Sequence, residues 1–193
     1  MKCLAVTAIL LCLITAACES STRTVDLSEY PEPSAFLRQE IEDRMAALRN
    51  QTEGQLYENM MRLAYIGETA VPFLIKGLDD QHVRVRSSSA YILGLMSDRR
   101  TIPALLPVLH DPSDVVRYEA ATALGSMGDR DGYGVLLEGL LDEDIKNRYK
   151  AHEALTLLTD LDFGYRHDDP PEMRRVAVLK WEAWVERMAA DDR

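Results

Sequence analysis

The sequence predicts an all-α protein, an α-solenoid of about four helix pairs with a capping helix at its C-terminus. Three observations predict this fold. A set of residues recurs every 31 positions, and each copy contains two stretches with apolar residues at helical spacing. A further helical stretch with two tryptophans follows the last copy. A fixed period of this length is typical of a stack of two-helix units.

The repeat is clearest where VRVRSSSAYILGLMSD, beginning at Val83, aligns with DVVRYEAATALGSMGD, beginning at Asp114. Four series of residues share the spacing of 31: Arg86, Arg117 and Arg148; Leu93, Leu124 and Leu155; Asp98, Asp129 and Asp160; and Asp80, Asp111 and Asp142. The first unit matches less well, because Gln55 stands in the arginine position. Atypical end units are expected, since a terminal unit faces water on one side.

Each unit is expected to contain two helices. In TIPALLPVLHD, Pro103 suits the first turn of a helix, whereas Pro107 inside it predicts a short or kinked first helix. Asp111 is the predicted N-cap of the second helix, with Pro112 at its first position. Gly128 is predicted to end that helix.

The pattern D…VR…A…ALG…GD, with Ile-Pro or Val-Pro at the next helix, resembles HEAT repeats of the short bacterial form also found in phycobilisome-lyase-like proteins. The resemblance implies a structural ladder in which each aspartate pairs with the arginine of its own or a neighbouring unit. The residues of this ladder would be Asp80, Arg86, Asp111, Arg117, Asp142 and Arg148. The resemblance covers about residues 33–160, which is most of the mature chain, and we place the solenoid at residues 34–160.

The first 18 residues, MKCLAVTAILLCLITAAC, are typical of a secretory signal peptide: Lys2 precedes an apolar run that is too short to span a bilayer. The segment resembles a bacterial lipoprotein signal, which implies that Cys18 is lipidated and anchors the protein to a membrane. Glu19 after the cysteine favours the outer membrane over the inner. The alternative is an ordinary cleaved leader and a secreted or periplasmic protein.

Residues 19–33 are polar and contain two prolines, so they are expected to be a flexible tether without fixed structure. The net charge of the chain is −10, which argues against nucleic acid as a partner, since an acidic surface repels phosphate. The mature chain would contain no cysteine except Cys18, so the core alone would hold the fold together.

Residues 161–193 are expected to form a loop and a cap helix. Pro171 restarts the helical pattern, and the segment is similar to the closing segment of many bacterial HEAT-repeat proteins. Trp181 and Trp184 lie three positions apart and could plug the exposed edge of the last unit. The alternative is an aromatic platform for a ligand such as a sugar.

Nothing in the sequence predicts a catalytic site, a metal or a cofactor. His152-Glu153 is similar to the His-Glu pairs of the HEAT-type deoxyhypusine hydroxylases, but those enzymes need several such pairs, each directly after the repeat arginine. Ser87, Tyr118 and Tyr149 occupy that position here. The cluster at His167, Asp168 and Asp169 reads as a solvated turn.

A partner protein would bind to the second helices, which line the concave side in HEAT solenoids. Positions one and five after the repeat arginine are expected to point away from the packing face, and two or three tyrosines among them would lie along one surface. The predicted partner-binding residues are Tyr91, Tyr118, Glu119, Thr122, Tyr149, Lys150 and Glu153. Tyrosine is favoured in interfaces because it buries a large area and keeps a polar tip. The alternative is that these tyrosines cover neighbouring helices.

The leading hypothesis is therefore a non-catalytic scaffold, tethered to a membrane of the bacterial cell envelope, that binds an unidentified envelope protein. The rival hypothesis is an envelope enzyme or ligand carrier on the same scaffold, either bilin-lyase-like or metal-binding. It would use His152, Glu153 and the tail acids, or the two tryptophans.

Overall fold

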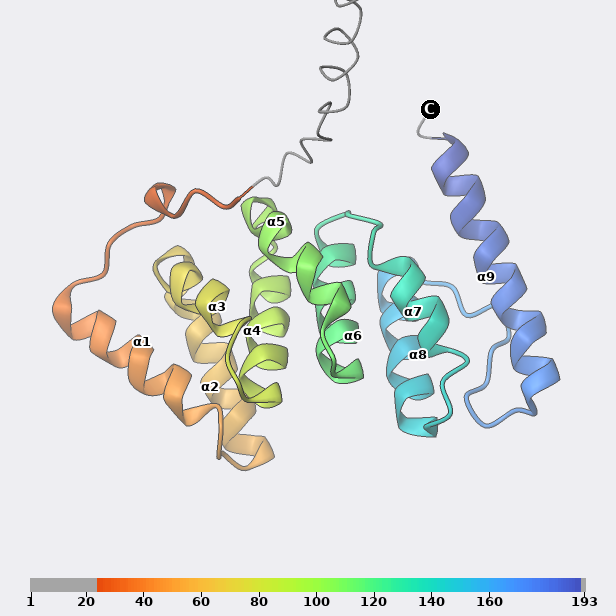
Figure 1. Cartoon of the computed structure of the whole chain (residues 1–193), viewed down its shortest axis with the longest axis horizontal. Helices are drawn as coiled ribbons and strands as arrows, with labels where there is room; N and C mark the ends of the chain where they lie inside the picture. Colours follow the sequence, from red (N-terminus) through yellow and green to blue (C-terminus); the bar gives the residue numbers. More distant parts are fainter. Residues whose placement is uncertain (1–23, 192–193) are drawn as a thin grey trace, which may run out of the picture.

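The computed structural model describes residues 24–191 of the 193-residue chain, and every regular element in this range is a helix (Figure 1). The first helices of the four pairs are α1 (Ala35–Ala47), α3 (Val71–Gly77), α5 (Ile102–Leu105) and α7 (Tyr133–Gly139). The second helices are α2 (Glu53–Ile66), α4 (Val83–Met96), α6 (Asp114–Ser126) and α8 (Ile145–Thr159). Helix α9 (Pro171–Asp191) follows, so the predicted all-α solenoid with a cap helix is confirmed. The predicted signal peptide and Cys18 lie outside the described residues.

The elements lie in chain order from α1 at one end of the molecule to α9 at the other (Figure 1). The second helices pack against one another along this row, α2 on α4, α4 on α6 and α6 on α8. Helices α4 and α6 are in especially close contact, because Gly94 faces Ala123: a Cβ on Gly94 would lie 2.9 Å from the Cα of Ala123. The outward sides of the second helices therefore form one continuous surface.

The repeated leucines form the core. Fully buried leucines recur at the same position of each second helix, at Leu63, Leu93, Leu124 and Leu155, and at the same position of three first helices, at Leu74, Leu105 and Leu136. Each buried leucine stabilises the fold by about 1.5–3 kcal/mol relative to an exposed one. The units are thus held together by equivalent apolar contacts.

Pro107, in the first helix of the third pair, shortens that helix as predicted. Helix α5 has only four residues and continues as a 3-10 helix, Leu106–His110, with Pro107 near its start. The predicted N-cap is wrong, however: Ser113 is the N-cap of α6, and the Asp111 carboxylate instead accepts a hydrogen bond from the Ser113 backbone N–H at 2.8 Å. Asp80 and Asp142 accept the same bond from the residue two positions later.

The ladder arginines bind main-chain carbonyls within their own units. Each donates from its guanidinium to the carbonyl of the aspartate six positions earlier: Arg86 to Asp80 at 2.8 Å, Arg117 to Asp111 at 3.0 Å and Arg148 to Asp142 at 2.8 Å. A guanidinium has several donors, so others remain for a neighbouring unit. These bonds join each second helix to the turn that precedes it.

Between units, the predicted ladder forms at Arg86 and Asp111, which share two hydrogen bonds of 2.6 and 3.0 Å. Their side chains are only 12% and 8% exposed. Asp80 pairs with Arg49 of the preceding unit at 3.0 Å. Burial opposes ionisation of Asp80, but hydrogen bonds from His82 and Arg49 outweigh it and hold the pKa at about 2.

The ladder does not continue to Asp142, which is a correction to the prediction. The Asp142 carboxylate accepts hydrogen bonds from the Tyr118 hydroxyl and the Asn147 amide, both at 3.2 Å. Arg117 pairs instead with Asp114 of its own helix. Arg148 reaches past the repeats and donates to the carbonyl of His167 in the tail loop at 2.8 Å.

The segment before α1 is ordered from residue 24 onwards, so the prediction of a flexible tether is wrong for residues 24–33. This segment, called the strap below, runs from beside α5 to the start of α1 (Figure 1). Tyr30 is buried, and its hydroxyl donates to the Asp98 carboxylate at 3.0 Å. The Arg100 guanidinium lies 4.5 Å from the centre of the Tyr30 ring. One aromatic residue with these two partners docks the strap across the first helices.

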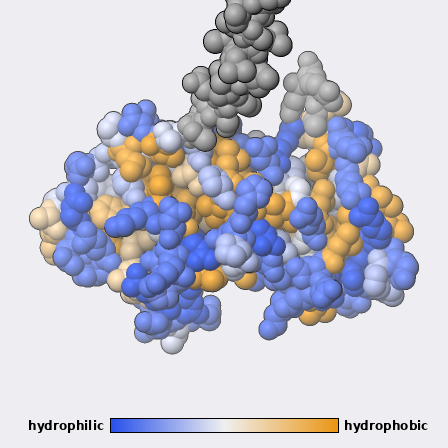
Figure 2. Space-filling model, in the orientation of Figure 1, coloured by the Kyte–Doolittle hydropathy of each residue, from blue (hydrophilic) through white to orange (hydrophobic). Residues whose placement is uncertain are grey.

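The C-terminal end is closed by α9. Trp181 is fully buried, with its ring centre 4.8 Å from that of Phe163, and Trp184 packs on Tyr133 of α7 at 5.9 Å. A fully buried ring cannot serve as a ligand platform, so the cap interpretation holds. The outer side of α9 exposes Met173, Val176 and Leu179, and Figure 2 shows apolar side chains at this end of the molecule.

The N-terminal end is closed by polar contacts. Glu40 of α1 pairs with Arg44 at 3.0 Å and with Arg62 of α2 at 3.1 Å, and Arg44 donates to the Asn59 side chain at 3.2 Å. A charged edge of this kind keeps the first unit in contact with water. Within residues 24–191, no helix has the length and apolarity needed to cross a membrane.

The buried ion pair gives a stability prediction. Replacing Asp111 with Ala leaves the guanidinium of Arg86 without its carboxylate, and should lower the free energy of unfolding by about 3 kcal/mol, the low end for breaking a buried pair. The low end applies because Arg86 keeps its bond to the Asp80 carbonyl. Urea unfolding followed by circular dichroism measures the loss. Asp79→Ala is the control, since Asp79 is exposed, and a similar loss in both variants would contradict the prediction.

Candidate functional site

The second-helix face is the outward surface of α2, α4, α6 and α8, and it contains most of the predicted partner-binding residues. Tyr91, Glu119 and Thr122 are half-buried there, whereas Lys150 and Glu153 are exposed. Glu119 lies close enough to Tyr91, Lys150 and Glu153 for its charge to interact with theirs. The structure thus brings four of the predicted residues together across three helices.

The prediction that Tyr118 lies on the binding surface is wrong, because its side chain is buried. It is only 5% exposed, and its hydroxyl donates to Asp142. Its ring packs over Gly139 of α7, where an added Cβ would lie 2.8 Å from the ring. Burial and the Asp142 charge raise the pKa of the phenol. The alternative interpretation, that a tyrosine covers a neighbouring helix, is therefore right for this residue.

Tyr149 stands at the same repeat position as Tyr118 but is 48% exposed. No repeat unit follows α8 to bury it, and the tail loop contacts only one edge: the His167 ring lies 5.4 Å away in a T-shaped arrangement. A tyrosine at this repeat position is therefore buried inside the stack, as Tyr118 is, and exposed at its end, as Tyr149 is.

Four large exposed side chains on the second helices of the first two units were not predicted from the sequence. They are Tyr57, Met61 and Tyr65 of α2, spaced by four, and Leu95 of α4. Tyr57 and Tyr65 are 55% and 82% exposed. Tyr57 also lies close enough to Tyr91 to contribute to the raised pKa of that phenol, which burial mainly causes.

A register change explains the omission. The positive-φ residues that end α2 and α4 are Gly67 and Ser97, which are 30 rather than 31 positions apart. Aligned by helix ends, Met61 matches Tyr91 and Tyr65 matches Leu95. The glycine at the end of the first unit was the available signal. Alignment on the arginine position missed it, because the first unit has no arginine there.

Glu119 has an unusual environment for a carboxylate on this face. It is half-buried, and among the residues of the described range none makes a hydrogen bond or ion pair with its side chain. Burial raises its pKa; Lys150 opposes this shift, and Glu153 adds to it. A partly desolvated charge without a direct partner gains from any cation that approaches it.

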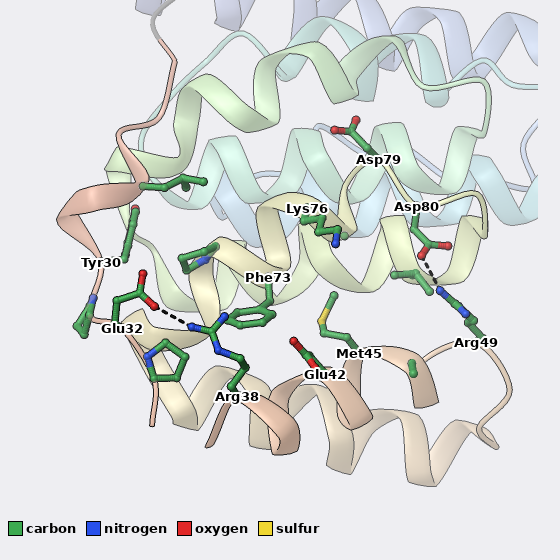
Figure 3. A pocket seen from close by; sticks show the side chains of 17 residues that line it. Tyr30, Glu32, Arg38, Glu42, Met45, Arg49, Phe73, Lys76, Asp79 and Asp80 are labelled. Carbon is green, nitrogen blue, oxygen red and sulfur yellow. Dashed lines mark hydrogen bonds and ion pairs between the residues drawn. The ribbon is translucent and has the colours of Figure 1, made fainter. Parts of the chain in front are cut away.

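A pocket of about 800 Å³ opens between the strap, α1 and α3 (Figure 3). Phe73 and Met45 contribute apolar side chains to it. Two ion pairs border it, Arg38 with Glu32 at 2.8 Å and Arg49 with Asp80. The Arg38 guanidinium lies 5.7 Å from the centre of the Phe73 ring. This pocket was not predicted from the sequence, because the strap that closes one side of it was expected to be a flexible tether.

The residues of the rival hypothesis do not converge on one site. The His152 ring packs on Tyr165 with their centres 4.9 Å apart, whereas Glu153 is exposed. Asp168 and Asp169 lie 3.5 and 4.0 Å from Arg166 in the tail loop. Over residues 24–191, no three His, Cys, Asp or Glu side chains are grouped as metal ligands would be.

Comparison with known proteins agrees with the geometry. Residues 71–156 match the family model for HEAT repeats. No curated protein sequence matches the chain at a significant level. A solved structure of human deoxyhypusine hydroxylase in complex with glycerol is similar, with 28% identity and a TM-score of 0.43. The match covers 64% of this chain but only 44% of that enzyme.

The half-buried His152 of the last helix pair predicts a loss of stability in mild acid. Burial lowers its pKa below the usual value for histidine, so the unfolded chain takes up the proton at a higher pH than the folded protein. The free energy of unfolding should therefore fall as the pH drops below about 6.5.

Urea unfolding of the wild type and of His152→Phe between pH 7.5 and pH 5 measures this effect. Phenylalanine keeps a ring against Tyr165 and cannot titrate, so the variant should lose less stability in acid. His110→Gln is the control, since His110 is exposed. Equal acid sensitivity of wild type and His152→Phe would contradict the assignment.

Proposed function

We propose that this protein is a non-catalytic HEAT scaffold that binds another protein on its second-helix face, next to a membrane of the bacterial cell envelope. The observation that supports it most is the group of large exposed side chains on adjacent helices, Tyr57, Met61, Tyr65 and Leu95, beside the half-buried Tyr91. Apolar and aromatic groups gathered on one surface are typical of protein interfaces.

The other conspicuous polar groups have structural partners, which is why a scaffold is proposed rather than an enzyme. Arg86 and Asp111 join two units, Tyr118 and Asp142 join the next two, and Arg148 holds the tail loop. What is left for function is a surface with a repeating shape. The second helices provide that surface.

The envelope location is proposed from the sequence of residues 1–18, which lie outside the described range. Because the strap is docked from residue 24, only residues 19–23 would separate a lipid on Cys18 from the fold. A segment of this length reaches at most about 20 Å. A lipidated protein would therefore be held close to the membrane surface, and we favour the outer membrane.

A ligand carrier is the second candidate function, and the pocket under the strap favours it. A volume of about 800 Å³ is in the usual range of ligand sites. Two ion pairs neutralise four of its charged groups, and the apolar side chains of Phe73 and Met45 would contact the ligand.

The binding face is tested by capture from solubilised envelope membranes with the full-length protein. Tyr57→Ala combined with Tyr91→Ala should weaken the capture of its partner at least tenfold, since a buried interface tyrosine commonly contributes more than 1 kcal/mol. Phe36→Ala is the matched control: Phe36 is exposed on α1, away from this face. Unchanged capture by the double variant would rule out the proposed face.

The anchor is tested by growing producing bacteria with radiolabelled palmitate. The protein should be labelled, and Cys18→Ser should remove the label, because the other cysteines, Cys3 and Cys12, lie within the predicted leader. Cys12→Ser should keep the label. Labelling that survives Cys18→Ser would disprove the lipoprotein prediction.

A further inference from the structure

The ion pairs of α2, α4 and α6 leave two carboxylates of these helices without a matching positive charge. Helices α2, α4 and α6 contain no lysine, and each of their arginines has a carboxylate partner within 4 Å. These pairs are Arg62 with Glu40, Arg84 with Glu53, Arg86 with Asp111 and Arg117 with Asp114. Every positive charge of these three helices is therefore already matched.

Two carboxylates of the same helices have no such partner among the described residues, Glu58 of α2 and Glu119 of α6. Glu58 is exposed to water, which weakens its attraction for a cation. Glu119 is half-buried beside Tyr91, so a charge that reaches it is less screened. Glu119 is thus the stronger of the two unmatched negative sites.

The surroundings of Glu119 do not supply its partner. Lys150 of α8 is near enough to oppose the rise in the pKa of Glu119 but forms no ion pair with it, and Glu153 acts in the opposite direction. One lysine and two glutamates leave a net charge of −1 at this point. On the other side, Tyr91 and then Tyr57 offer aromatic rings, which attract cations through their faces.

We infer that the partner bound by this face supplies a lysine or arginine that pairs with Glu119 and lies against Tyr91, with neighbouring apolar side chains covering Met61 and Leu95. This inference rests on the proposed function, since it names the chemistry of the partner that the scaffold binds. A charge-assisted hydrogen bond to a half-buried carboxylate is among the stronger polar contacts. The expected partner segment is basic and apolar, and the acidic surface of this protein would also attract it from a distance.

The experiment uses the full-length protein as bait for a display library of short random peptides. The recovered peptides are synthesised with a fluorescein label, and their dissociation constants are measured by fluorescence anisotropy. We expect lysine or arginine next to an aromatic or aliphatic residue in the recovered peptides. Replacing that basic residue with glutamine should weaken binding about tenfold.

Matched variants of the protein locate the contact. Glu119→Gln should weaken binding about tenfold, whereas Glu138→Gln, on the exposed side of α7, should leave it unchanged. The peptide change and Glu119→Gln together should weaken binding little more than either alone, because both remove the same contact. Circular dichroism confirms that the variants are folded.

The outcomes separate this inference from the proposed function. The inference is overturned if the recovered peptides contain no basic residue, or if Glu119→Gln leaves their binding intact. In that case, loss of binding in the Tyr57→Ala, Tyr91→Ala variant would still support the proposed face. If no peptide binds, or if the tyrosine changes have no effect, both proposals fail. Analytical ultracentrifugation tests whether a second copy of the chain occupies the face. If the protein sediments as a dimer and the tyrosine changes dissociate it, the inference is overturned.

Discussion

A helix pair of this length cannot bury its apolar side within itself, and the rest of the structure depends on this constraint. Each unit places a leucine of its second helix in a core shared with its neighbours, at Leu63, Leu93, Leu124 and Leu155. The close contact of Gly94 with Ala123 and the ion pair of Arg86 with Asp111 belong to the same junctions. Stability is therefore spread along the row rather than gathered in one centre.

The same constraint explains the two ends. The outermost units have no neighbour on one side, and that side is covered differently at the two ends. Glu40, Arg44 and Arg62 keep the first unit polar, while α9 covers the last unit with Trp181. The strap adds a third contact by docking Tyr30 across the first helices. With the ends and part of the first-helix side covered, the second-helix face remains open for a partner.

Position in the stack also decides what a repeated residue does. Tyr118 and Tyr149 occupy equivalent positions, yet one is buried over Gly139 and the other is displayed. The tyrosine that has a unit beyond it becomes part of the core, and the one at the end becomes surface. The same side chain therefore packs in the middle of the row and is exposed at its end.

The sequence by itself determined the period, the helical class and the short α5, because these depend on spacing and on residues such as Pro107 that act locally. It also identified Tyr91, Glu119, Lys150 and Glu153 as neighbours, since equal spacing brings equivalent positions together. Only the tertiary structure decided that Tyr118 is buried, that the ladder stops before Asp142 and that the strap is docked. Each of these depends on which atoms a neighbouring unit presents at one place, and a spacing rule treats all units as alike. The aromatic group on α2 was missed for the same reason, because one residue fewer between helix ends shifts the register of the first unit.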